Sequence, residues 1–323
     1  MKQNFKNQDQ NIPDITQDVK DLKTKEVTIE QTFDMFEKIE AEYNTVTPPC
    51  ILYRYNRGGD RYYYTNPESP DGMISYTTLA GYEVGMSYAE RLMKWRAEVG
   101  EEAAQYIMKS TAAQGTGEHI LIGLFSRGEL NSFAEVKDFG FDWALSQGYP
   151  HLAAEWMDYY CESIASWMAF VKEKNVEVLA VEFPLFDEEW GIAGLVDIVA
   201  EMDFNRKRRK CIIDIKRNAR SGEMKYAFQL QAQKEVWNKK YPDIFEIEGI
   251  FNWSSKNWTR TKGRNPSYDL VNRTVNKFSS TMSSRLSYIR QEGIISPPIT
   301  HLLFRGEFSL EGLSEIDLSQ IIL

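Results

Sequence analysis

Polar residues interrupt two apolar, strand-like segments near the middle of the chain. The segment Cys211–Lys216 alternates with a period of two, which predicts a β-strand. Asp214 and Lys216 then lie on one face of that strand. Ile213 and Ile215 point to the opposite face, so the two polar side chains share a pocket.

A second strand is predicted just upstream, and a tight turn would pair it with the first. Ala193–Ala200 is apolar or small at every position except Asp197. If the turn falls at Asn205 and Arg206, the strands pair antiparallel with Asp197 directly opposite Asp214. The Cβ atoms of opposed residues lie roughly 4.5–5.5 Å apart, so this register brings two carboxylates together.

Two carboxylates at this separation repel each other unless a cation lies between them. Carboxylate oxygens are ligands that Mg²⁺ and Mn²⁺ prefer, so the pair predicts a divalent-metal site. The same pattern also fits a cross-strand carboxylate pair at a solvated sheet edge. Four apolar neighbours argue against that exposure: Val196, Ile198, Ile213 and Ile215.

Glu182 and His119 are further candidate ligands. Glu182 lies in Val176–Pro184, a predicted strand of the same sheet, and fits either a third carboxylate or a strand-end side chain in solvent. His119 lies in Ala112–Ile122, where small residues permit close packing on a neighbouring element. Its imidazole fits either a metal ligand or an ordinary core or surface histidine.

A helix is predicted after the second strand. Glu223–Lys240 is rich in helix-forming residues. Four of its side chains form one stripe through their i, i+3 and i+4 spacing: Tyr226, Gln229, Gln233 and Trp237. Amides beside aromatic rings fit contacts with a nucleic acid, and they also fit an amphipathic helix with solvated glutamines.

These features follow one another in a definite order along the chain: Gly115-Thr116-x-x-His119, Glu182, Gly194-x-x-Asp197, Asp214-x-Lys216 and Gln229-x-x-x-Gln233. In this order they resemble the motifs of the PD-(D/E)XK nuclease superfamily. Within it, the chain is most similar to RecB-type exonucleases, including the CRISPR adaptation nucleases, the mitochondrial genome maintenance exonuclease and phage-encoded relatives. The resemblance covers roughly residues 74 to 260.

The resemblance implies a set of metal ligands. Asp197 and Asp214 would be the core ligands of Mg²⁺ or Mn²⁺, with the carbonyl of Ile215 completing the shell. His119 would be an additional ligand, and Glu182 joins the catalytic set as a further acid.

The resemblance also implies roles for the remaining motif residues. Lys216 would act on the water nucleophile and on the transition-state phosphate, and Gln229 would be the glutamine of the family's Gln-x-x-x-Tyr motif. The chain departs from the family at Gln233, which takes the place of the tyrosine. Tyr226 or Trp237, on the same stripe, could replace that aromatic contact.

The implied function is a Mg²⁺- or Mn²⁺-dependent DNA exonuclease that hydrolyses phosphodiester bonds in phage or bacterial recombination, repair or replication. Two alternatives stay open: a non-catalytic DNA-binding subunit of a recombination complex, and a structure-specific endonuclease of the same superfamily. Some RecB-type members hold an iron–sulfur cluster on four cysteines. We expect none here, because the chain has only Cys50, Cys161 and Cys211.

The net charge of −9 requires that any DNA contact use local basic regions rather than the whole surface. The segment Arg206–Lys210 provides five consecutive cations at the predicted turn, where they are expected to hold the DNA backbone beside the metal site. A second stretch, Lys256–Arg264, places an aromatic ring between cations, which suits phosphate contact with base stacking. A basic turn can also simply be solvated. The candidate DNA-binding residues are Arg206, Lys207, Arg208, Arg209, Lys210, Arg217, Arg220, Tyr226 and Trp258.

The chain as a whole predicts a single α/β nuclease domain. Residues 1 to 28 are polar and are expected to form a flexible arm; the domain spans residues 29 to 305, and residues 306 to 323 form a C-terminal tail. The expected fold is a restriction-endonuclease-like mixed central sheet flanked by helices, with an N-terminal helical region. Without an apolar signal stretch, and with three unpatterned cysteines, the expected location is the cytoplasm of a bacterium or of a phage-infected cell.

Overall fold

The described strands of the protein form one mixed sheet. The computed structural model describes residues 53–57, 60–65, 72–84, 86–221, 223–256, 265–274 and 313–315. Its strands follow the order β8-β7-β6-β5-β3-β2-β1-β9, with β4 on the other edge of β5. The pairs β3–β5 and β6–β7 are parallel and the others are antiparallel. The strands are β1 (Tyr53–Arg57), β2 (Asp60–Tyr64), β3 (Met73–Ser75), β4 (Glu177–Asp187), β5 (Ile192–Phe204), β6 (Lys207–Ile215), β7 (Gly249–Ser255), β8 (Tyr268–Asn272) and β9 (Leu313–Glu315).

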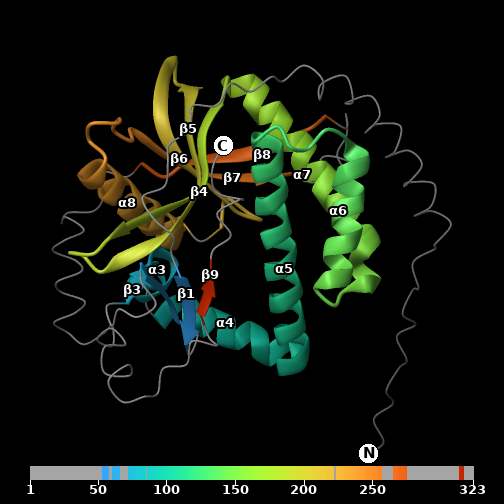
Figure 1. Cartoon of the computed structure of the whole chain (residues 1–323). Helices are drawn as coiled ribbons and strands as arrows, with labels where there is room; N and C mark the ends of the chain where they lie inside the picture. The colour runs from blue at the N-terminus through green and yellow to red at the C-terminus, as the bar shows by residue number, and fades with distance from the viewer. Residues whose placement is uncertain are drawn as a thin grey trace, which may run out of the picture.

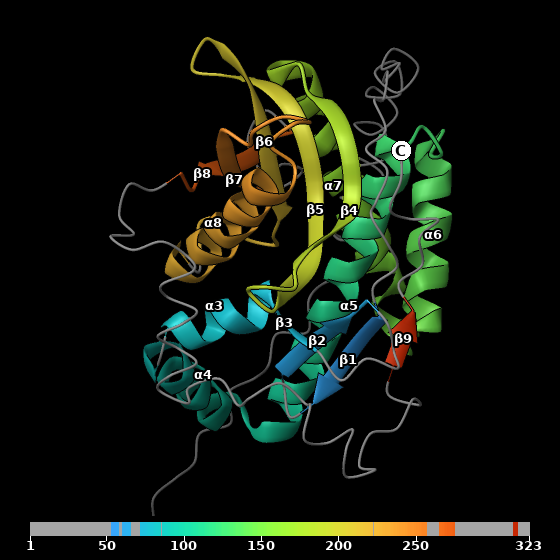
Figure 2. The same ribbon diagram turned by 60° about the vertical axis from the view of Figure 1, so that its left-hand side comes forward.

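Helices cover both faces of this sheet (Figures 1 and 2). One apolar cluster joins α5, α6 and α7 to the sheet, and a second joins α3 and α8 to the opposite face. The long α5 runs past the sheet beside α7 (Figure 1). The helices are α3 (Tyr76–Val84), α4 (Met86–Val99), α5 (Glu101–Ser126), α6 (Phe133–Ser146), the 3₁₀ turn η1 (Pro150–Leu152), α7 (Ala153–Lys174) and α8 (Glu223–Lys240).

The β5–β6 hairpin has the predicted register. Asn205 and Arg206 form a two-residue turn with φ values of 51° and 61°, which is the left-handed pair that a type I′ hairpin turn needs. The ladder runs from this turn to the pair Ile198↔Ile213. Asp197 and Asp214 come directly after the last pair of this ladder, so its register agrees with the expected alignment of the two acids, although the ladder itself does not include them.

Strand β5 changes partners in the middle of the sheet. Its start pairs with β3 through Ile192 and Ala193, whereas its second half pairs with β6 from Ile198 onward. Strand β4 follows the other edge of β5 from Ile192 to Glu201. Asp197 therefore lies where the neighbouring strands β3 and β6 separate, which leaves room for a pocket.

Close approach to α6 and α7 fixes the position of α5. A Cβ atom on Gly117 would lie 2.2 Å from the Tyr160 hydroxyl oxygen and 2.8 Å from Cδ1 of Trp143. Only glycine fits at this contact between α5, α6 and α7. The expected close packing of the small-residue segment is thus confirmed. This packing also fixes the position of the next turn of α5, which carries His119.

The broader expectations for the fold agree with the structure. A mixed sheet flanked by helices is confirmed. Residues 1 to 28 lie outside the described part of the chain, and of the tail only β9 is described, paired with β1. Among the helices that the structure describes, none is long and apolar enough to cross a membrane.

Candidate active site

The separation of β3 from β6 opens into a pocket of about 690 Å³. Helix α5 forms one wall, and the ends of β3 and β6 with helix α8 form the others. Many of the residues singled out in the sequence line it, among them His119, Glu182, Asp197, Asp214, Ile215, Lys216 and Gln229. Elements that are far apart in the chain thus bring the predicted motifs together.

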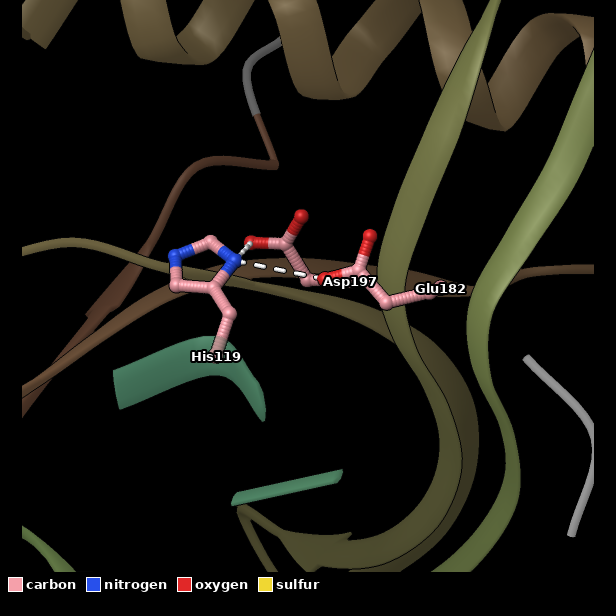
Figure 3. Close-up of side chains that lie close together, drawn as sticks. All are labelled: His119, Glu182 and Asp197. Carbon is pink, nitrogen blue, oxygen red and sulfur yellow. Dashed lines mark hydrogen bonds and ion pairs between the residues drawn. The ribbon is translucent and has the colours of Figure 1, made fainter. Parts of the chain in front are cut away.

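His119, Glu182 and Asp197 form a compact group of possible metal ligands in this pocket (Figure 3). Nδ1 of His119 lies 3.4 Å from Oε1 of Glu182 and 3.6 Å from Oδ2 of Asp197. One ligand atom from each residue can be chosen so that all three lie within 4.8 Å of one another. The three side chains are 27%, 21% and 11% exposed, so the group opens into the pocket while remaining mostly shielded from water.

Glu182 reaches this group from an unusual backbone conformation. The pairs Val181↔Ile198 and Phe183↔Val196 place it directly opposite Asp197 in the β4–β5 ladder. Its φ is 48°, in the left-handed region that side chains other than glycine rarely adopt inside a strand. Such outliers concentrate at functional sites.

Electrostatics in the group favour a charged histidine in the absence of metal. Burial opposes the protonated form of His119, but the carboxylates of Asp197 and Glu182 outweigh it and raise the pKa of His119 to about 9. A metal ion and this proton would compete for the same nitrogen.

Asp214 is held differently from the other two acids. It is 1% exposed, and its Oδ1 accepts from Nζ of Lys216 at 2.5 Å and from Nε2 of Gln229 at 3.0 Å. Its Oδ2 accepts from Nδ2 of Asn252 at 2.5 Å. Burial raises the pKa of Asp214 to about 6, against the opposing charge of Lys216. The group nearest His119 thus contains Glu182 rather than Asp214, and the assignment of Asp214 as a metal ligand stays a prediction.

Asp197 links the two halves of the site. Its Oδ2 accepts from the backbone N–H of Ile215 at 2.8 Å, in addition to its approach to His119. The last residue of β6 is therefore tied directly to the candidate metal group. The predicted role of the Ile215 carbonyl stays a prediction.

Tyr226 is the aromatic residue that contacts Lys216. Nζ of Lys216 lies 5.2 Å from the centre of the Tyr226 ring, a cation–π distance. Trp237 is fully buried in the core instead. Gln233 also lines the pocket, and its Nε2 donates to the carbonyl of Leu195 at 3.1 Å. Of the two aromatic residues expected to replace the family tyrosine, Tyr226 is the one next to Lys216.

Three arginines give the pocket a positive wall. Arg217 was expected from the sequence; its guanidinium lies 5.9 Å from the centre of the Tyr159 ring. Arg61 and Arg127 also line the pocket, and neither was recognised from the sequence. Both come from segments, β2 and the end of α5, whose position at the site depends on the tertiary fold. Arg127 is paired with Glu129 at 2.7 Å.

The basic hairpin lies away from this pocket. Its turn is eight residues from Asp197 along β5, which at roughly 3.3 Å per residue is about 26 Å. Two of its cations are engaged with acids: Arg208 with Glu177 at 3.1 Å and Lys210 with Glu201 at 2.5 Å. The expected position beside the metal site is therefore wrong, because the length of β5 and β6 carries Arg206–Lys210 to a surface remote from the acidic group. Their contact with DNA stays a prediction.

The other expected DNA-binding residues lie outside the pocket or outside the described chain. Arg220 is largely exposed and pairs with Asp269 at 2.7 Å. Trp258 and the rest of residues 257 to 264 lie outside the described residues. Lys256, at the start of that stretch, also pairs with Asp269, at 2.8 Å.

Three buried polar residues near the site were not recognised from the sequence: Glu118, Asn252 and Arg273. Glu118 accepts from the Tyr159 hydroxyl at 2.6 Å, and Asn252 contacts Asp214 while accepting from Arg273. Asn252 carried a usable signal, since it interrupts an apolar strand in the same way as Asp197 does.

Comparison with protein-family models and with curated proteins finds no match to this chain. The geometry of the pocket therefore carries the functional argument.

Proposed function

We propose that the chain is a divalent-metal-dependent nuclease, and specifically a DNA exonuclease of the PD-(D/E)XK type. The observation that carries the proposal is the convergence of three acids, one histidine and one lysine in a single pocket: His119, Glu182, Asp197, Asp214 and Lys216. A sheet that pairs an Asp-bearing strand with an Asp-x-Lys strand supports the restriction-endonuclease-like form of the fold.

The donor set suits Mn²⁺ or Mg²⁺. Two carboxylate oxygens and one imidazole nitrogen are ligands that Mn²⁺ accepts readily, and Mg²⁺ favours the oxygens. Adjacent ligands at roughly 2.1 Å in an octahedral shell lie about 3.0 Å apart. The separations of 3.4 and 3.6 Å from His119 Nδ1 are close to that spacing. A divalent ion held there would activate water and neutralise phosphate charge.

The chain's own residues supply the remaining functions. The Lys216 ammonium, held by Asp214, places a positive charge beside the position of the scissile phosphate, where charge develops in the transition state. Gln229 donates a second hydrogen bond to the same oxygen of Asp214 that Lys216 contacts. Arg61 and Arg217 provide phosphate contacts along the wall, despite the net charge of −9.

A digestion experiment tests the proposal. End-labelled single-stranded, linear duplex and closed circular DNA are incubated with the protein in Mg²⁺, Mn²⁺, Ca²⁺ or EDTA. We expect metal-dependent release of nucleotides from linear DNA, with closed circles left intact. Asp197→Asn should abolish hydrolysis and leave DNA binding in place. Asp203→Asn is the control. It makes the same change on the same strand, at the exposed hairpin end, and it should keep activity.

The outcomes separate the alternatives. Cleavage of closed circles would identify an endonuclease instead of an exonuclease. DNA binding without hydrolysis in any metal would favour the non-catalytic subunit. Hydrolysis that survives in Asp197→Asn would refute the assignment of this pocket.

A further inference from the structure

The Asp214 carboxylate is held by three side-chain donors from three elements. Lys216 follows β6, Gln229 lies on α8 and Asn252 lies on β7. Lys216 and Gln229 share Oδ1, whereas Asn252 alone among these three contacts Oδ2. The orientation of the Asn252 amide therefore decides whether Oδ2 meets a donor or an acceptor.

Strand pairing places Asn252 beside Asp214. The two residues are register partners in the parallel β6–β7 pair, and both are buried, at 0% and 1% exposure. Side chains of register partners project from the same face of a sheet. An asparagine at this position can, however, present either its oxygen or its nitrogen to the neighbouring carboxylate, because its amide can turn over.

Arg273 removes that choice. Its Nε donates to Oδ1 of Asn252 at 2.7 Å. A guanidinium has only donors, so the Asn252 oxygen must face Arg273 and the amide nitrogen must face Asp214. Arg273 is 5% exposed, so the contact is shielded from competing water.

The same guanidinium also fixes the loop after Lys216. Nη2 of Arg273 donates to the carbonyl of Ala219 at 2.6 Å, and the Ala219 N–H donates to the Ser254 hydroxyl at 3.1 Å. One buried side chain thus holds the loop that leaves Lys216 together with the amide that contacts Asp214.

We propose that Asn252 and Arg273 are positioning residues: Arg273 orients the Asn252 amide, and that amide holds the Asp214 carboxylate toward Lys216 and the pocket. Neither residue needs to touch the substrate. The kinetic test of this inference rests on the proposed nuclease function, whereas its structural test does not.

The kinetic test compares two replacements of Arg273. Arg273→Lys keeps a side chain with donors only, so it preserves the orientation of Asn252. Arg273→Gln can donate or accept, so it releases the amide. We expect Arg273→Gln to lower kcat roughly 10–100-fold, the range for residues behind a metal site, with KM for DNA little changed. Arg273→Lys should recover most of this loss, and Asn252→Ala should match Arg273→Gln.

Asn238→Ala is the matched control. Asn238 also bridges two groups, since it donates to the carbonyl of Ile247 and accepts from its N–H, but it lies outside the pocket lining. It should lose stability in urea unfolding while keeping kcat. The inference is overturned if Arg273→Gln keeps wild-type kcat, if Arg273→Lys loses as much as Arg273→Gln, or if Asn238→Ala loses as much kcat as Asn252→Ala.

A crystallographic comparison covers the remaining cases. If the wild-type protein hydrolyses no DNA, the proposed function fails, and crystal structures of the wild type and of Arg273→Gln still test the positioning. If Arg273→Gln does not fold, Asn252→Ala takes its place. We expect the Asp214 carboxylate to rotate away from Lys216 in the variant. An Asp214 side chain that keeps its position would overturn the inference.

Discussion

Replacing His119 with glutamine tests the electrostatic structure of the pocket without any assumption about substrate. In the metal-free protein, Asp197 and Glu182 raise the pKa of His119 from 6.5 to about 9. Because the folded-state pKa lies above the unfolded one, the protonated ring stabilises the fold fully below pH 6.5. That contribution is lost as the pH rises through about 9.

The size of this contribution follows from the pKa difference. At roughly 1.4 kcal/mol per pH unit, the change from 6.5 to about 9 corresponds to about 3 kcal/mol. The His119 side chain is 27% exposed, and screening by water reduces the expected loss of unfolding free energy to ~2 kcal/mol. His119→Gln keeps a polar side chain but removes the titrating ring, so this part of the pH dependence should disappear.

Urea unfolding in EDTA at pH values from 6.5 to 9 measures the difference. His151→Gln is the control, because it removes an exposed histidine that lies outside the pocket lining. Calorimetry adds a second readout: Mn²⁺ binding should release a proton in the wild type but not in His119→Gln, whose affinity should also be weaker. The reasoning is refuted if wild type and His119→Gln lose the same stability over this pH range.

Three further predictions concern other parts of the molecule. Lys216→Ala should lower kcat roughly 10²–10³-fold with metal affinity little changed, and unaltered turnover in steady-state assays would exclude a catalytic role. Neutralising Arg206–Lys210 should leave turnover at saturating DNA unchanged, and it should flatten the salt dependence of binding by roughly 0.7–0.9 in log–log slope per lost phosphate contact. A wild-type salt slope would make the hairpin a solvated turn. Gly117→Ala should destabilise the fold by about 1–3 kcal/mol in urea unfolding, because its Cβ would meet Tyr160, and wild-type stability would contradict that contact.

The hairpin that carries the two aspartates could be predicted because its determinants are local. The alternation in β6, the apolar run in β5 and the turn at Asn205 and Arg206 together fix one register. The placement of Asp197 opposite Asp214 follows from these few residues. No distant contact is needed to decide it.

The grouping of the acids could not be predicted in the same way. Glu182 reaches His119 because β4 pairs with the far edge of β5 and because its own φ is positive, and neither property has a sequence signature. The contribution of Arg273 depends on the parallel pairing of β6 with β7, which joins strands separated by all of α8. Long-range pairing decides which of the recognised polar residues become neighbours.

Two requirements meet at Glu182: its backbone is left-handed, and its side chain supplies a carboxylate to His119. A left-handed conformation costs an ordinary side chain about 1–2 kcal/mol, and glycine or asparagine would avoid most of that cost. Neither residue supplies a carboxylate to His119. A chain selected for stability alone would thus carry glycine or asparagine at this point of β4. Glu182 therefore combines a local cost in stability with the delivery of a negative charge to His119 in the pocket.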